Sequence, residues 1–310
     1  MIHLAYDYIR IGSILKADFA KPLLSAIIET GENVVVLRSI RNVIGAYVPR
    51  KAPRIAHIYS RVYKRILYWY LDLRDQLYIK RAGFTQLPPA HLRDRVHGST
   101  DIRGFLEVGK KCSQDIESAL MKIDRDLGSF RHILDFGCGC GRTFIWFANR
   151  SQPSNFYGTD TDADAISWCR NNLSFGSFGV NDPLPPLEYP SEMFDLIYAI
   201  SVFTHLDEDY QFRWLSELKR IAKPKGILLS TVHGHHCWKD LPPEPLAKIE
   251  KEGILFVPVN TWKGVFPDWY QVTFHTKEYI LERYAEYFDV LDYIPRGMND
   301  VQDMIILQKT

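Results

Sequence analysis

The stretch HILDFGCGCGRT, residues His132–Thr143, decides the fold of this chain. A short apolar run that contains Asp135 ends at three glycines in alternate positions, Gly137, Gly139 and Gly141. Glycine at a strand-to-helix turn lets a ligand approach the backbone closely, and the first N–H groups of the helix attract negative charge. The spacing is one residue tighter than the G-x-G-x-x-G of dinucleotide-binding turns. The loop favours a ligand at this turn, and a glycine turn used only for packing is the alternative.

Downstream of this loop, the chain alternates between apolar runs and helical patterns. The expected strands are Ile133–Phe136, Phe156–Gly158, Phe194–Ile200 and Gly226–Thr231. The expected helices between them are Thr143–Arg150, Asp164–Leu173 and Tyr210–Ala222. Continuous apolar runs are typical of strands buried on both faces. The alternation therefore predicts an α/β fold, a doubly wound parallel sheet with helices on both faces.

The C-terminal part breaks this alternation. A helix over about Thr276–Tyr287 is expected to precede two strands, Val290–Ile294 and Met304–Gln308, joined by a short turn that contains Pro and Gly. Two strands joined in this way form a hairpin, so the last strand is expected to run antiparallel to the others.

Charge divides the chain into two regions. Residues 1–100 hold 16 Lys and Arg against 7 Asp and Glu, whereas the remainder holds 22 against 30. We expect residues 1–96 to form a helical cap rich in basic and aromatic residues, and residues 97–310 to form the sheet domain, which begins with a helix within Ser99–Gly128. Residues 234–275 are too long for a plain connection, and insertions of this length are typical of lids or substrate loops.

Composition excludes several classes of protein. Of the 310 residues, 46% are hydrophobic and 24% are charged, as in ordinary globular proteins. No uninterrupted apolar run reaches the roughly 18 residues of a spanning helix, and the N-terminus is not expected to be a secretory signal. The five cysteines follow no disulfide framework and suit a reducing compartment, so a cytoplasmic location is expected.

The next strand indicates which kind of ligand the glycine loop binds. NFYGTD places Asp160 nineteen residues beyond Gly141, where a carboxylate can accept hydrogen bonds from both hydroxyls of a ribose. ILDFGCGCGR, YGTD, VNDPLPPLEYPSEMFDLIYAISVFTHL and AKPKGILL follow one another in the order of the motifs of class I S-adenosylmethionine-dependent methyltransferases. Residues 97–310 resemble this family, and the C-terminal part resembles a bacterial subgroup that acts on small molecules. The resemblance implies a Rossmann-like seven-stranded sheet and S-adenosylmethionine as the cofactor.

The resemblance also implies roles for the residues that match its motifs. Glycines 137, 139 and 141 would line the methionine part of the cofactor, Asp135 would reach its amino group, and Asp160 would hold the ribose. Asn181 or Asp182 would contact the adenine amine, and Ile200 and Ser201 would supply backbone beneath the sulfonium. Cys138 and Cys140 depart from the family, which has small or varied residues between the glycines. Cys138 is counted among the cofactor-binding residues, but space filling is the main expectation for both, with redox sensitivity as the alternative.

Methyl transfer to a hydroxyl needs a base in addition to correct positioning, and histidine suits this role near neutral pH. The candidates are His233 and His235 after the fifth strand and His205 after the fourth, with Tyr270 next in line. His233 is favoured over His205, because a packing or capping role is the stronger alternative for His205. The segment HGHHC could also be a metal cluster, but no second set of ligands accompanies it, so no metal site is predicted. His275 is expected to order the turn before Thr276.

The acceptor is expected to be a small or glycan-like molecule. The aromatic residues Trp262, Phe266, Trp269 and Tyr270 could form the wall of an apolar acceptor pocket or the core of a lid. The basic N-terminal region could contact an anionic acceptor, a membrane surface or a carrier protein, or could simply be a solvated helical face. Nucleic acid is not expected as a partner, because SVFT follows the fourth strand in place of an Asn/Asp-Pro-Pro-aromatic tetrapeptide.

Three functional hypotheses follow. The first is O- or N-methylation of such an acceptor. The second is a lyase or cyclase of the same fold that turns the cofactor on its own carbon chain and releases methylthioadenosine. The third is a non-catalytic cofactor-binding protein, which an intact glycine loop and ribose acid disfavour.

Overall fold

The computed structural model describes residues 53–81, 83, 84, 86–148, 154–259 and 269–310. The chain divides into two compact units, Met1–Tyr70 and Leu71–Thr310. Helix α4 (Pro53–Arg81) supplies one of the helical segments expected near the N-terminus, and the expectation for residues 1–52 lies outside the described residues. The description below concerns the second unit.

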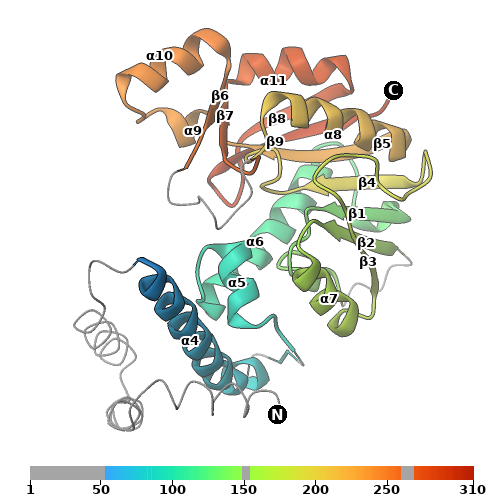
Figure 1. The fold of residues 1–310 in the computed structure, drawn as a ribbon. Coiled ribbons are helices and arrows are strands. Elements are labelled where there is room, and N and C mark those ends of the chain that lie inside the picture. The colour runs from blue at the N-terminus through green and yellow to red at the C-terminus, as the bar shows by residue number, and fades with distance from the viewer. Residues whose placement is uncertain (1–52, 82, 85, 149–153, 260–268) are drawn as a thin grey trace, which may run out of the picture. The chain divides into compact units, whose positions relative to one another are not determined.

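A seven-stranded sheet forms the centre of this unit (Figure 1). Its strands are β1 (His132–Phe136), β2 (Asn155–Asp160), β3 (Gly176–Val180), β4 (Phe194–Ala199), β5 (Ala222–Val232), β8 (Asp289–Met298) and β9 (Gln302–Gln308). They lie in the order β3-β2-β1-β4-β5-β9-β8. The first five strands are parallel, and β9 pairs antiparallel with both β5 and β8. The prediction of a doubly wound sheet with an antiparallel C-terminal strand is confirmed.

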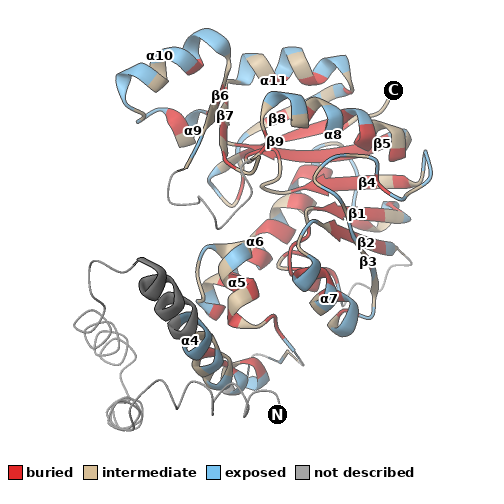
Figure 2. Cartoon of the chain, in the orientation of Figure 1, coloured by how far each residue is buried: buried red, intermediate tan, exposed pale blue. Residues whose placement is uncertain are grey.

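Two hydrophobic clusters cover the two faces of the sheet. The central strands are accordingly mostly buried (Figure 2). Along β1, Ile133 belongs to the cluster that includes residues of α6 (Ile102–Met121) and α7 (Ala163–Asn172), whereas the next residue, Leu134, belongs to the cluster of α8 (Glu208–Ile221) and α11 (Lys277–Arg283). Each of these helices begins at a side chain that accepts backbone N–H hydrogen bonds: Asp101, Asp162, Asp207 and Thr276. Such caps stabilise a helix by about 1 kcal/mol each.

The α-helix expected over Thr143–Arg150 is wrong for the described part of this range. The chain instead forms a short 3-10 helix, Phe144–Phe147. A 3-10 helix places residues i and i+3 on one side. Both Phe144 and Phe147 pack on Phe156, each with ring centroids 5.7 Å apart. Packing of these two rings on β2 therefore favours the tighter helix.

The segment 234–275, expected as a lid-like insertion, contains its own secondary structure. Helices α9 (His235–Trp238) and α10 (Pro243–Glu252) precede a two-stranded antiparallel sheet of β6 (Ile254–Val257) and β7 (Val272–His275). This segment has a small hydrophobic cluster of its own, formed by Trp238, Ile249 and Leu255. The predicted wall residues Trp262 and Phe266 lie outside the described residues.

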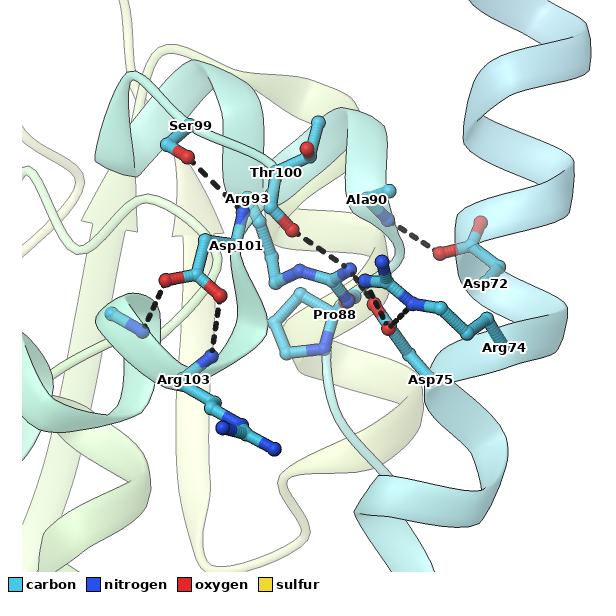
Figure 3. A network of polar contacts seen from close by, with 11 residues as sticks. Asp72, Arg74, Asp75, Pro88, Ala90, Arg93, Ser99, Thr100, Asp101 and Arg103 are labelled. Carbon is cyan, nitrogen blue, oxygen red and sulfur yellow. Dashed lines mark hydrogen bonds and ion pairs between the residues drawn. The ribbon is translucent and has the colours of Figure 1, made fainter. Parts of the chain in front are cut away.

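A polar network fastens α5 (Ala90–His97) to the end of α4 (Figure 3). The buried Arg93 guanidinium pairs with Asp75, and its Nη1 atom donates to the carbonyl oxygen of Pro88 at 2.7 Å. Asp72 accepts a hydrogen bond from the N–H of Ala90 at 2.6 Å. The predicted boundary after residue 96 falls within α5, and the compact unit begins earlier, at Leu71. None of the helices in the described part of the chain has the length and apolar character needed to cross a bilayer.

Candidate active site

A cavity of about 530 Å³ opens beyond the carboxyl ends of β1, β2 and β4. Strand order reverses between β1 and β4, and open α/β sheets bind ligands at this switch point. Most of the predicted cofactor residues line the cavity: Asp135, Gly137, Cys138, Gly139, Asp160, Asn181, Ile200 and Ser201. The parallel strands thus bring together side chains that are up to 66 residues apart in the sequence.

The glycine loop forms the floor of this cavity. Gly137 and Gly139 have φ values of 80° and 53°, which residues other than glycine rarely adopt. A Cβ atom on Gly137 would lie 2.4 Å from Cγ2 of Val202, and one on Gly139 would lie 2.6 Å from Cγ2 of Val96. Glycine is therefore required at both positions for the backbone conformation, and it also leaves the backbone accessible to a ligand. Gly141 does not line the cavity but packs against Leu173, 2.8 Å from the position of a Cβ atom.

The buried cysteines surround this loop. Cys138 lines the cavity, whereas Cys140 is completely buried behind it. The thiols of Cys138 and Cys169 both face the carbonyl oxygen of Gly139, each at 3.6 Å. Burial raises the pKa of the Cys138 thiol. Burial also makes these thiols poor nucleophiles, as expected for space-filling residues.

Asp160 at the end of β2 is tied to the glycine loop. Its Oδ2 atom accepts from the N–H of Gly139 at 2.7 Å, and its Oδ1 atom accepts from the N–H of Asp162 at 2.8 Å. Burial raises the pKa of Asp160, and the two backbone N–H groups counteract this shift. A carboxylate offers about four acceptor sites. The Asp160 carboxylate therefore retains acceptor capacity for a ligand hydroxyl.

Asp135 is the second carboxyl group of the cavity. Burial, the largest cause, raises the pKa of Asp135 to about 8, and the charge of Asp160 adds to the shift. The Tyr198 hydroxyl and the Arg142 guanidinium lower it again. A cationic ligand group beside Asp135 would favour the ionised carboxylate.

The residues predicted at the ends of β3 and β4 differ in position. Asn181 lines the cavity and accepts from the Thr159 hydroxyl at 2.7 Å, which fixes its amide. Asp182 is exposed and is not among the cavity-lining residues. Ser201 lines the cavity with φ at 58°, and its N–H donates to the Thr231 hydroxyl at 2.8 Å. The turn after β4 is thus held by β5.

Two aromatic residues of the segment 234–275 also line the cavity. Trp269 and Tyr270 line the cavity, and the Tyr270 ring stacks on the imidazole of His205 with centroids 4.3 Å apart. The Nδ1 atom of His205 donates to the carbonyl oxygen of Gln271 at 2.7 Å, which leaves Nε2 as the acceptor nitrogen of the neutral ring. Burial lowers the pKa of His205 to about 4. The imidazole is therefore neutral at physiological pH.

The described residues that line the cavity include neither His205 nor any of the other candidate histidines. The His233 ring is 6.0 Å from that of His205, and its Nδ1 atom donates to the carbonyl oxygen of Thr273 at 3.1 Å. Burial lowers the pKa of His233 as well. His235 is exposed on α9, and His275 is buried with Nε2 3.0 Å from Gln211 Oε1. Among the described residues, no group of three His, Cys, Asp or Glu side chains is placed to hold a metal ion.

Sequence reasoning missed the cationic residues of the cavity. Arg95 on α5 lines it and forms ion pairs with Asp162 at 3.0 Å and Asp164 at 3.2 Å. Arg142, directly after the third glycine, lines it too and donates from Nη1 to the carbonyl oxygen of Val96 at 3.1 Å. Arg142 carries a sequence signal because it belongs to the glycine motif. Arg95 carries none, because its place depends on how α5 packs.

Comparison with known proteins agrees with this fold and site. Residues 133–226 match the family described as a methyltransferase domain. The described site also fits the cofactor of that family: the glycine backbone is accessible, Asp160 retains acceptor sites, and Asp135 is placed to favour a cationic group. The sheet unit therefore contains a methyltransferase domain over residues 133–226, and S-adenosylmethionine is the cofactor that the cavity residues fit.

Curated relatives are similar over part of the chain. A fatty-acid O-methyltransferase of Mycolicibacterium smegmatis is 28% identical over 103 residues, which are 33% of this chain and 36% of the relative. A phosphoethanolamine N-methyltransferase of Plasmodium falciparum is 28% identical over 131 residues, 41% of this chain and 45% of the relative. The chain thus matches less than half the length of these two relatives. A solved S-adenosylmethionine-dependent methyltransferase from Clostridium acetobutylicum has 14% identity and a TM-score of 0.47, covering 71% of this chain and 96% of that one.

Proposed function

We propose that this protein transfers the methyl group of S-adenosylmethionine to an oxygen or nitrogen atom of a small or glycan-like acceptor. One observation carries the proposal: the same cavity is lined both by the glycine loop with Asp160 and by Trp269 and Tyr270. Donor and acceptor can therefore meet in one cavity. Holding two reactants in that way is the largest contribution to this type of transfer.

The cofactor side of the cavity binds and orients. When bound, S-adenosylmethionine supplies a methyl group that carries the positive charge of its sulfonium. Asp160 would accept hydrogen bonds from the ribose hydroxyls, and the backbone of Gly137 and Gly139 would leave room for the methionine part. Asp135 would accept from the amino group. Asn181 would contact the adenine, and Ile200 and Ser201 would contribute backbone near the sulfonium.

His205 is the base that the geometry favours. Its neutral ring has its Nδ1–H fixed on a backbone carbonyl, so Nε2 can accept a proton from an acceptor hydroxyl. The ring stacks on Tyr270, which lines the cavity, so the imidazole is one contact away from the cavity lining. His233, whose ring is 6.0 Å from that of His205, is the second candidate. The exposed His235 is the weakest of the predicted bases.

The proposal also includes the kind of acceptor, the role of the N-terminal region and the cellular location. The two curated relatives are named for fatty-acid and phosphoethanolamine methylation, and both names support a small acceptor. We also assign acceptor selection to the basic N-terminal region, residues 1–96, of which Arg95 and Val96 line the cavity. Contact with a membrane or carrier through this basic region belongs to the same proposal. The free cysteines of the described chain suit a cytoplasmic location.

The proposal is tested by identifying the product into which the cofactor is converted. The protein would be incubated with cofactor labelled at the methyl group and with a cell extract, and products would be separated by mass spectrometry. Methyl transfer predicts S-adenosylhomocysteine in equal amount to one labelled acceptor. Methylthioadenosine would instead indicate an internal displacement, and an unchanged cofactor in every extract would indicate a binding protein.

A further inference from the structure

Helix α4 presents an apolar stripe to solvent. Trp69 and Leu73 are 65% and 60% exposed, and Ile66 is 37% exposed. The three residues have the spacing i, i+3 and i+7, so they lie along one side of the helix. Leu71 and Ile79, which lie on the other side, are buried. Single apolar residues are common on protein surfaces, whereas a continuous stripe that includes an exposed Trp indicates a binding surface.

The charges of α4 are sorted by sign. Its two acidic residues turn toward α5: Asp72 accepts from the N–H of Ala90, and Asp75 pairs with Arg93 (Figure 3). The exposed charged residues of α4 in the described part of the chain are all cations: Lys64, Arg65, Lys80 and Arg81. None of these four forms an ion pair with another described residue. The helix therefore combines the apolar stripe with positive charge that is available to anionic groups.

This combination of features fits the surface of an anionic bilayer. Helices that lie in a membrane surface carry Trp and Leu on one side and Lys and Arg beside them. The apolar side chains enter the boundary between headgroups and acyl chains, and the cations attract acidic lipids. A protein partner fits less well, because a specific protein interface buries about 800 Å² on each partner, whereas this stripe consists of three side chains in single file.

We infer that α4 docks this protein on the surface of an anionic membrane, with Ile66, Trp69 and Leu73 inserted and the four cations at lipid headgroups. The inference deepens the proposed function, because it commits the contact of the basic N-terminal region to a membrane, and it rests on that proposal only for the link to acceptor selection. The Asp75–Arg93 pair fastens α4 to α5, whose last turn contributes to the cavity lining. Docking of α4 would therefore act on a helix that borders the cavity.

Vesicle flotation of the full chain tests the inference. Vesicles of phosphatidylcholine alone would be compared with vesicles of phosphatidylcholine and phosphatidylglycerol in equal amounts, at low and at high salt. Thermal unfolding would establish that each variant is folded. Calorimetry with S-adenosylhomocysteine on the same proteins would follow the cofactor site separately. We expect the wild type to bind phosphatidylcholine alone at least about tenfold more weakly than the mixture, because the cations then lack acidic lipids.

The stripe variant, Trp69→Gln/Leu73→Gln, removes two apolar side chains without changing the charge. It should bind the mixed vesicles about 10- to 100-fold more weakly than the wild type does, because insertion of these side chains is lost. The matched control, Met121→Gln/Leu291→Gln, removes two exposed apolar side chains elsewhere and should bind as the wild type does.

The charge variant, Lys64→Gln/Arg65→Gln, should bind the mixed vesicles about 10- to 30-fold more weakly at low salt. Each Lys or Arg beside an anionic surface strengthens binding by about fivefold. High salt should bring the variant and the wild type together, since it screens exposed charges. The matched control, Lys239→Gln/Lys251→Gln, removes two exposed cations of the segment 234–275 and should leave binding unchanged.

Three results would overturn the inference. A wild type that binds neither kind of vesicle would mean that residues 1–52 or a second copy of the chain cover the stripe, and a dimer lost in the stripe variant on sedimentation would indicate the second copy. Full binding of mixed vesicles by the stripe variant would place the membrane contact elsewhere. Equal binding to both kinds of vesicle would exclude recognition of anionic lipid. A wild type that floats with mixed vesicles but does not bind S-adenosylhomocysteine would instead refute the cofactor assignment and leave the docking intact.

Discussion

The two sides of the cavity are built in different ways. On the cofactor side, the glycine loop and Asp160 come from two adjacent strands, and a hydrogen bond from Gly139 to Asp160 joins them directly. On the acceptor side, the start of β7 and the residue before it pair with the loop after β4: the N–H of Gln271 donates to the carbonyl oxygen of His205 at 3.0 Å, and that of Thr273 to the carbonyl oxygen of Thr204 at 2.8 Å. The partners of these bonds are 66 and 69 residues apart.

Under the proposed function, this difference separates the residues that bind the cofactor from those that select the acceptor. A cofactor site built from neighbouring strand ends is fixed by the sheet itself. An acceptor wall contributed by an inserted segment can change its aromatic residues without disturbing the sheet. The comparison therefore predicts that substitutions on the acceptor side change the rate, whereas those on the cofactor side change affinity for the cofactor.

The largest expected effect is on the acceptor side. With a hydroxyl acceptor, His205→Ala should lower kcat by about 10²- to 10⁴-fold, because the proton then has no positioned base. Affinity for S-adenosylhomocysteine, measured by calorimetry, should stay within about twofold, since a residue outside the cofactor contacts contributes little to binding. His233→Ala tests the second candidate, and the exposed His235→Ala is the matched control. Normal turnover in all three variants would exclude a histidine base.

On the cofactor side, Asp160→Ala should weaken S-adenosylhomocysteine by about 1.5–3 kcal/mol through loss of charge-assisted hydrogen bonds to the ribose. Part of this loss comes from the Gly139 N–H that Asp160 also binds. Asp160→Asn, which keeps an acceptor oxygen, should lose less. The same affinity in all three proteins would remove Asp160 from the ribose site and break the comparison.

The pH dependence of cofactor binding tests the role of Asp135. Its pKa of about 8 means that the free protein holds a proton there at pH 7, whereas the cofactor ammonium favours the carboxylate. Binding therefore releases a proton, and affinity should rise up to tenfold per pH unit as pH increases toward about 8. Calorimetry in buffers of different ionisation enthalpy measures this proton. Asp135→Asn should abolish the slope, and a pH-independent wild type would contradict the assignment.

The smallest effect is expected at Arg95, which belongs to α5 and not to the sheet. Its side chain is 39% exposed, and surface ion pairs contribute about 0–1 kcal/mol. Arg95→Gln should weaken S-adenosylhomocysteine by less than about fivefold, and high salt should remove the difference. A loss above tenfold would show that α5 contributes to the cofactor site as strongly as the strands.

The sequence indicates the cofactor side better than the acceptor side for a physical reason. The buried strands have continuous apolar runs, and the glycine loop and Asp160 are local features of strand ends. The β6–β7 sheet was not predicted, because its strands have four residues each and one follows a stretch rich in Pro and Trp. The contact between His205 and Tyr270 depends on backbone pairing across 66 residues. The position of Arg95 depends on the packing of α5. Tertiary contacts of this kind leave no periodic signal.

A titration of S-adenosylhomocysteine onto the wild type and Gly139→Val tests the central claim most directly. A side chain at Gly139 would occupy the loop at a φ of 53°, with Cβ 2.6 Å from Val96. The account predicts one site of micromolar affinity in the wild type and no measurable binding in a variant that thermal unfolding shows to be folded. Equal affinity in both proteins, or no binding by the wild type, would contradict it.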